Sequence, residues 1–226
     1  EMASGFQADD RYNMRFTGEQ EDQAKDQGFL GMAFLVAIFV VFLIIVAQFN
    51  SISYPVIVMS TVVFSTIGVL LGLVVFRMEF VGLMTTLGII SLIGVVVNNA
   101  IVLMDFARLL FQRAQRKLGL DEDIIIPIHE SREALVIAGH TRLRPVLLTA
   151  VTAVLGLLPL AIGLNFNFFT LFSELNPHIH MGGDNVVFWG PLSWAVIFGL
   201  IFATFLTLIM VPVMLLIIMK IKHRRQ

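Results

Sequence analysis

Long apolar stretches dominate the hydrophobic pattern of the chain. No Asp, Glu, Lys or Arg occurs in residues 29–48, 54–76, 80–104, 145–173 and 185–219. A helix needs about 20 apolar residues to cross the hydrocarbon layer of a bilayer, so each stretch is long enough. The strands of a membrane β-barrel would alternate apolar and polar residues, and these stretches do not alternate. The pattern therefore predicts an all-α polytopic membrane protein with five spanning helices.

The connections between these stretches set the expected helix boundaries. Phe49–Ser53 and Arg77–Glu79 are short, so the first three helices should be antiparallel neighbours. The last stretch is too long for one crossing, and Pro191 is a suitable start for its helix. The predicted spans are at about 29–48, 54–76, 80–106, 145–165 and 191–219.

The segment 108–144 is expected to be one connection outside the membrane. It should contain an extension of the third helix, an acidic turn at 121–123 and a separate helix around 129–140. That separate helix either lies on the membrane surface or packs beneath the bundle.

The polar N-terminal segment has a different pattern. Residues 11–17 alternate in polarity, which predicts a strand, and a helix is expected to start near Gly18. A lone strand is not stable, and no signal peptide precedes it. We therefore expect residues 1–17 to be the remnant of an external domain, and 18–226 to be the membrane bundle of a longer protein.

Composition agrees with a membrane protein and narrows its function. The chain is 58% hydrophobic and 14% charged, with a mean hydropathy of +0.89, whereas soluble domains are about 25% charged. It has no cysteine, so disulfides and thiolate chemistry are excluded. It also lacks a serine–histidine–acid set, a phosphate-binding loop and a basic–aromatic surface. We expect neither an enzyme nor a nucleic-acid-binding protein.

The charges predict an orientation in the membrane. One side would carry residues 1–28, 77–79 and 165–184, which hold four Lys or Arg against ten carboxylates. The other side would carry 108–144 and the C-terminal tail, which hold eleven Lys or Arg. Because basic loops stay in the cytoplasm, the N-terminus should be outside and the C-terminus inside.

The third span contains the most informative polar residues. Asn98 and Asn99 are adjacent amides at membrane depth, and they need hydrogen-bond partners on other helices or in water. At helical spacing, one stripe carries Gly88, Ser91, Val95, Asn98, Val102 and Asp105. This stripe is either a hydrogen-bonded packing surface between helices or a polar pathway for protons.

The fourth span has a second polar stripe, which includes Thr149, Thr152 and Gly156. Threonines in membrane helices often bond only the carbonyls of their own helix, so this stripe also has a purely structural interpretation. Arg142 and Arg144 precede the span, where arginines commonly anchor the cytoplasmic end.

The outer loop before the last span contains His178, His180, Met181 and Asp184. These residue types can ligate copper or zinc. Without a second ligand cluster they are more typical of an ordinary loop, and no metal site is predicted.

Five segments together resemble the resistance–nodulation–division (RND) exporters, in the order and spacing of that family. They are Thr-Gly-Glu-Gln-Glu at 17–21, Gly-Val-Val-Val-Asn-Asn-Ala-Ile-Val-Leu-Met-Asp-Phe-Ala at 94–107, Arg-Leu-Arg-Pro-Val-Leu-Leu-Thr-Ala at 142–150, Gly-Leu-Leu-Pro-Leu at 156–160 and Phe-Trp-Gly-Pro-Leu at 188–192. The chain is most similar to the branch that exports hydrophobic and amphiphilic compounds. It resembles helices eight to twelve, preceded by the last strand of the second periplasmic loop.

The resemblance implies a proton-driven exporter in the bacterial inner membrane, with a periplasmic N-terminus and a cytoplasmic C-terminus. It implies that the chain works with the N-terminal half of the transporter, as a homotrimer, with a periplasmic adaptor and an outer-membrane channel. The energy source would be the proton gradient, without a cofactor. A metal-exporting member of the superfamily, and a non-transporting scaffold or protein-translocation accessory, are the alternatives.

The resemblance also implies site residues. Asn98, Arg142 and Thr149 match the Lys, Arg and Thr positions of the family's proton relay, while its pair of aspartates belongs to the other half. Asn98 departs from the family pattern, because an amide cannot carry a charge. We hypothesise that Arg142 supplies the missing cation, and that Asn99 and Asp105 contribute to the same relay.

Overall fold

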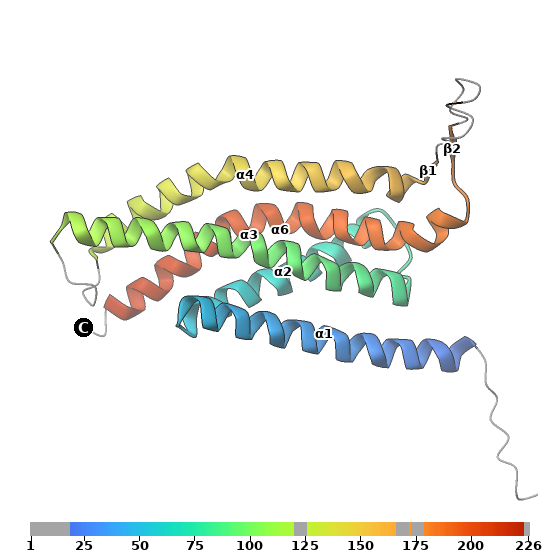
Figure 1. Cartoon of the computed structure of the whole chain (residues 1–226), viewed down its shortest axis with the longest axis horizontal. Helices are drawn as coiled ribbons and strands as arrows, with labels where there is room; N and C mark the ends of the chain where they lie inside the picture. The colour runs from blue at the N-terminus through green and yellow to red at the C-terminus, as the bar shows by residue number, and fades with distance from the viewer. Residues whose placement is uncertain (1–18, 120–125, 166–171, 173–178, 224–226) are drawn as a thin grey trace, which may run out of the picture.

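The computed structural model describes residues 19–119, 126–165, 172 and 179–223. Within these ranges the chain forms the long helices α1 (Glu19–Phe49), α2 (Ser53–Val75), α3 (Gly82–Lys117), α4 (Ile128–Ile162) and α6 (Asp184–His223) (Figure 1). Strands β1 (Leu164–Asn165) and β2 (His180–Met181) pair in an antiparallel ribbon. All five long helices have the length and composition to cross a membrane. The prediction of an all-α fold with five spanning helices is confirmed.

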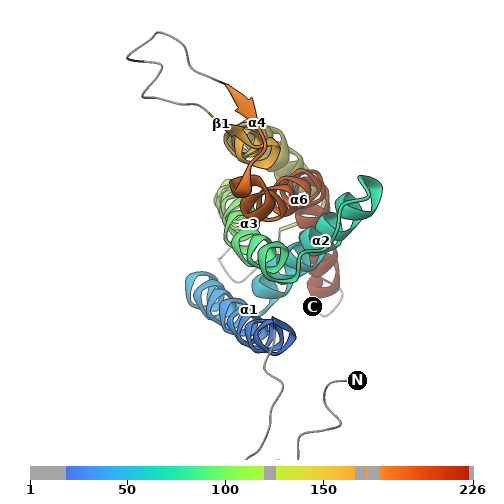
Figure 2. The same ribbon diagram turned by 90° about the vertical axis from the view of Figure 1, so that its right-hand side faces the viewer.

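Helix α6 occupies the centre of the bundle. It packs extensively on α2, α3 and α4, whereas α1 lies at the edge and packs mainly on α2 and α3 (Figure 2). Successive helices run in opposite directions, so α1, α3 and α6 end where α2 and α4 begin. We call this the basic end of the bundle, because most of its Lys and Arg residues are there, and the opposite end the hairpin end, after β1 and β2.

Glycines on α2 allow α6 to approach closely. Gly68 and Gly72 are one turn apart, and they face the rings of Phe202 and Phe198 on α6. A methyl group added at Gly68 would lie 2.7 Å from Cγ of Phe202, and one at Gly72 would lie 2.6 Å from Cδ2 of Phe198. Neither position has room for a side chain. Small residues spaced by four are a common way for membrane helices to bring their backbones together.

Two further glycines form the contact between α3 and α6. A methyl group added at Gly88 would lie 2.9 Å from the carbonyl oxygen of Leu192 and 2.9 Å from Cβ of Ala195. Gly199 of α6 receives the side chain of Leu92, which is fully buried. These contacts fix the rotation of α3, with Gly88 and Leu92 turned towards α6.

The α2–α3 turn is short because α2 ends in a compact hydrogen-bonded motif. The backbone N–H of Met78 donates to the carbonyl of Leu73 at 2.9 Å, and that of Arg77 donates to Val74 at 3.2 Å. Arg77 has a φ of +52° at the position where this motif usually has glycine. The turn returns the chain antiparallel, as its length predicted.

Two helices are longer than the spans predicted for them. Residues 128–140 do not form a separate helix, because α4 runs without interruption from Ile128 to Ile162 through Pro145. Helix α6 begins at Asp184 rather than at Pro191, which lies inside it. Where the membrane begins along each helix stays a prediction, and the expected strand at 11–17 and acidic turn at 121–123 lie outside the described residues.

Close packing at Gly72 predicts the effect of a small substitution. Gly72→Ala should destabilise the protein by about 1–3 kcal/mol, because the new methyl group overlaps Phe198 and overpacking costs this much. Thermal unfolding of the purified protein in detergent measures the change.

Gly139→Ala is the matched control, since Gly139 also lies within a helix but has no atom within 4 Å of the added methyl group. It should be neutral or stabilise by up to about 1 kcal/mol, the ordinary helix preference for alanine. Equal melting temperatures for the two variants would contradict the close contact between α2 and α6.

Candidate functional site

The polar stripe predicted on α3 lies on an uncovered side of that helix. Ser91, Asn98 and Asp105 are exposed, whereas Gly88 is buried against α6. Asn99, one residue further round the helix, points inward and is 8% exposed. The exposed polar residues of the stripe are thus seven residues apart, with the exposed apolar residues Val95 and Val102 between them. Asn99 lies beside the stripe, on the buried side of the helix.

On α4 the predicted polar residues are exposed as well. Thr149 donates a hydrogen bond from Oγ1 to the carbonyl of Val146 at 2.9 Å. Thr152 donates to the carbonyls of Leu148 at 2.8 Å and Thr149 at 3.0 Å. These are the bonds to the helix's own carbonyls that the structural interpretation expects. Each hydroxyl oxygen still has lone pairs with which it can accept a hydrogen bond.

Arg142 connects the two helices. It is half-buried, and its Cζ lies 4.6 Å from the centre of the Phe106 ring on α3. Its Nε is buried without a hydrogen-bond partner in the described part of the chain. An unpaired buried donor costs about 1–3 kcal/mol, and more when the group is charged. An acceptor placed near this Nε–H would remove the cost.

The contact between Arg142 and Phe106 also sets the register of α3 against α4. Asn98 lies eight residues from Phe106, or about 12 Å along its helix, and Thr149 lies seven residues from Arg142, or about 10 Å. Because the helices are antiparallel, both distances run towards the hairpin end. Asn98 and Thr149 therefore lie at nearly the same depth, on helices that diverge from the basic end (Figure 1).

The Arg142–Phe106 contact joins the polar sides of α3 and α4, and we refer to the polar residues of these two sides together as the α3–α4 polar face. It consists of Ser91, Asn98, Asp105, Arg142, Thr149 and Thr152. An amide exposed to lipid would leave its donors and acceptors unpaired, at a cost of several kcal/mol. The face is therefore unsuited to contact with lipid and suited to contact with polar groups of other helices or with water.

The candidate metal loop is not assembled in the described residues. His178 lies outside them, and His180 and Asp184 lie at the hairpin end on β2 and α6. No cluster of three or more His, Asp or Glu side chains suitable for a metal ion occurs in the described ranges.

Phe106 was not singled out from the sequence. Its neighbour Asp105 lies on the predicted stripe, but an aromatic residue in an apolar helix is usually a packing residue. The signal that identifies Phe106 is its contact with Arg142, which depends on the register between two helices and is invisible in one helix's periodicity.

The apolar helical bundle, with polar residues exposed on α3 and α4, defines an α-helical membrane protein, the class to which secondary transporters belong. Residues 2–166 match the AcrB/AcrD/AcrF family. The chain therefore belongs to this family of RND efflux transporters, which confirms the resemblance seen in the sequence.

Similar proteins include two kinds of curated relative. The swarming motility protein SwrC of Bacillus subtilis is 37% identical, over 87% of this chain and 16% of its own length. The multidrug resistance protein MdtC of Erwinia tasmaniensis is 32% identical, over 84% of this chain and 15% of its own length.

A solved structure agrees with this assignment. The crystal structure of a heavy metal efflux pump superimposes with a TM-score of 0.65 at 25% identity, covering 92% of this chain and 18% of the pump. The chain thus spans about one sixth of the length of the proteins it matches.

Proposed function

We propose that this chain forms part of the membrane domain of a proton-driven exporter of small amphiphilic or hydrophobic compounds in the bacterial inner membrane. Membership of the family and similarity to a multidrug resistance protein support the transport class. By the same analogy, the working unit is a homotrimer with a periplasmic adaptor and an outer-membrane channel. The observation that carries the proposal is the uncovered α3–α4 polar face.

In this proposal the α3–α4 polar face is one wall of the proton relay. The other wall is the N-terminal half of the transporter, whose helices bring carboxylates to the face. Arg142 supplies a fixed positive charge, since arginine side chains stay protonated at physiological pH. A cation beside paired carboxylates eases the repulsion between them and lets both ionise.

The neutral residues have a different role in the relay. Asn98 and Thr149 lie at the same depth and can orient water or a carboxylate by hydrogen bonds, but neither can hold a charge. Asn99 adds an amide on the buried side of α3 next to Asn98, and Asp105 adds an exposed carboxylate next to Phe106 in the sequence. The groups that gain and lose protons would then be the carboxylates, and residue 98 would stay neutral.

Metal export is the second candidate, favoured by the structural similarity to a heavy metal efflux pump. The residues of this chain do not supply an argument of their own for it, because the described part contains no metal-binding cluster. The two candidates differ in what the exporter protects against, so one assay can separate them.

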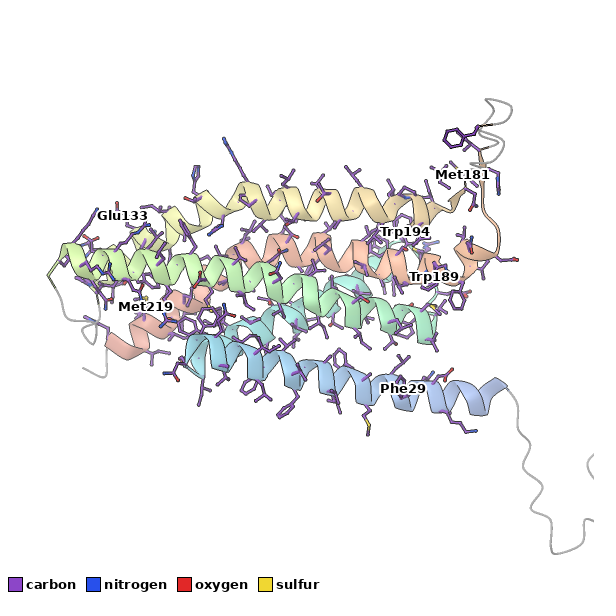
Figure 3. All side chains as sticks on the ribbon, viewed as in Figure 1. Phe29, Glu133, Met181, Trp189, Trp194 and Met219 are labelled. Carbon is purple, nitrogen blue, oxygen red and sulfur yellow. The ribbon has the colours of Figure 1, made fainter. Side chains whose placement is uncertain are left out.

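The orientation follows from the charges at the two ends. The basic end holds Arg108, Arg113, Arg116, Lys117, Arg132, Arg142, Arg144 and Lys220. Near the hairpin end, α6 carries Trp189 and Trp194, opposite Glu133 and Met219 (Figure 3). Tryptophans concentrate at membrane interfaces and basic residues on the cytoplasmic side. We therefore place the basic end in the cytoplasm and the hairpin end in the periplasm.

Single cysteines test this orientation, because the chain has none of its own. Met181→Cys, which is 70% exposed at the hairpin end, should react with a membrane-impermeant maleimide on intact spheroplasts. Gln112→Cys, exposed at the basic end, should react only after the membrane is opened. Labelling of both cysteines in intact spheroplasts would refute the proposed topology.

The relay proposal predicts that Asn98→Leu and Thr149→Val lower the rate of efflux about tenfold or more in the full-length transporter. Both changes remove groups that orient water or a carboxylate in the relay, and misplacing a reacting group by about 1 Å can cost about 100-fold in rate. Dye efflux from energised cells measures the rate, and protein abundance in the membrane is measured alongside. Stability is a small confounder, because hydrogen bonds between membrane helices average about 0.6 kcal/mol.

Thr66→Val is the matched control. Thr66 lies on α2, away from the α3–α4 polar face, and donates to the carbonyl of Val62 at 3.1 Å much as Thr149 does to Val146. It should leave efflux unchanged. If Asn98→Leu and Thr149→Val behave like this control, the polar stripe is packing only. Protection of the host against copper or zinc salts but not against dyes would favour the metal exporter.

A further inference from the structure

The partner of Arg142 is an aromatic ring rather than an anion. Its guanidinium carbon lies 4.6 Å from the centre of the Phe106 ring, well within the range in which the electron-rich face of a ring attracts a cation. Both side chains are half-buried and come from different helices, Phe106 from α3 and Arg142 from α4. Such a contact holds the charge in place without neutralising it.

The carboxylate that lies next to Phe106 on α3 does not neutralise Arg142. Asp105 is exposed, and within the described ranges no ion pair joins it to Arg142. Adjacent residues on a helix point about 100° apart. Because Phe106 is turned towards α4, Asp105 is turned away from α4. The buried Nε of Arg142 also has no acceptor in the described residues. The arginine is thus held by the ring of Phe106, and its Nε–H has no acceptor among the described residues.

We propose that Phe106 is a positioning residue for the relay. Its ring face holds the Arg142 guanidinium between α3 and α4, so that the terminal Nη–H groups are presented to a carboxylate on the helices that cover the α3–α4 polar face. This inference rests on the proposed function, because it requires Arg142 to act in proton transfer. A ring suits the task better than a carboxylate, since a carboxylate would occupy the same N–H groups that the relay needs.

Replacement of Phe106 by amino acids of graded ring character tests the proposal in the full-length transporter. Phe106→Leu should lower proton-coupled efflux about threefold to thirtyfold, the range expected for a half-buried cation–ring contact. Phe106→Trp should restore most of the activity, because the indole face attracts cations at least as strongly. Protein abundance and melting temperature report any folding defect.

Fluorinated phenylalanines separate positioning from packing, since fluorine weakens the negative ring face while changing the ring's size little. With one, two and three fluorines at residue 106, efflux should fall stepwise. Phe202 is the matched control: its ring packs on Gly68 in the same bundle, and no described cation contacts it. Fluorination there should leave efflux unchanged.

Arg142→Gln makes failure of this inference distinguishable from failure of the proposed function. If Arg142→Gln abolishes efflux and the fluorine series at residue 106 is flat, Phe106 is only a packing residue and the relay proposal stands. If Arg142→Gln exports normally, Arg142 has no part in the relay and both ideas fall. In the supporting outcome, Arg142→Gln abolishes efflux and the fluorine series at residue 106 lowers it stepwise, while the series at residue 202 does not.

Discussion

The close approach of α6 to α2 and α3 determines the arrangement of the whole bundle. Helices in lipid gain no hydrophobic energy from meeting each other, so they associate through tight packing and through hydrogen bonds. Here the packing depends on glycines: Gly68 and Gly72 receive two rings of α6, and Gly88 meets the α6 backbone. Gly88 faces α6, and Asn98 and Asp105 lie roughly 80° and 100° round the helix from it, on the exposed side of α3. The polar face is a consequence of where the glycines are.

This geometry leaves the α3–α4 polar face exposed, although its residues are too polar for contact with lipid. A lipid-facing helix should be apolar, as α1 is over most of its surface, with Phe29, Leu35 and Phe39 exposed. The α3–α4 polar face instead exposes an amide, a carboxylate and threonines at helical spacing. Arg142 adds a buried donor without an acceptor in the described residues. Polar groups from further helices, or an enclosed file of water, would satisfy both features at once.

Part of the fold and of the candidate site can be predicted from the sequence. The five helices follow from apolar length alone, and the α3 stripe follows from helical spacing, so both were predicted. The sequence predicts a break in α4 at Pro145, because proline lacks the N–H that would continue the helical hydrogen bonds. The structure shows α4 to be continuous there. Thr141, whose carbonyl loses the hydrogen bond from residue 145, is exposed, which makes the loss tolerable near the membrane surface. The facing of Gly68 and Phe202, and of Phe106 and Arg142, depends on the register between helices, and no single helix encodes that register.

The central claim is that the α3–α4 polar face meets polar groups and not lipid in the assembled transporter. A spin label at Asn98, compared with one at Val63, which is 60% exposed on α2, measures this through collisions with dissolved oxygen, which concentrates in lipid. The account predicts that oxygen relaxes the label at residue 63 strongly and the label at residue 98 weakly. Equal and high oxygen accessibility at the two positions would mean that Asn98 faces lipid, and would contradict the account.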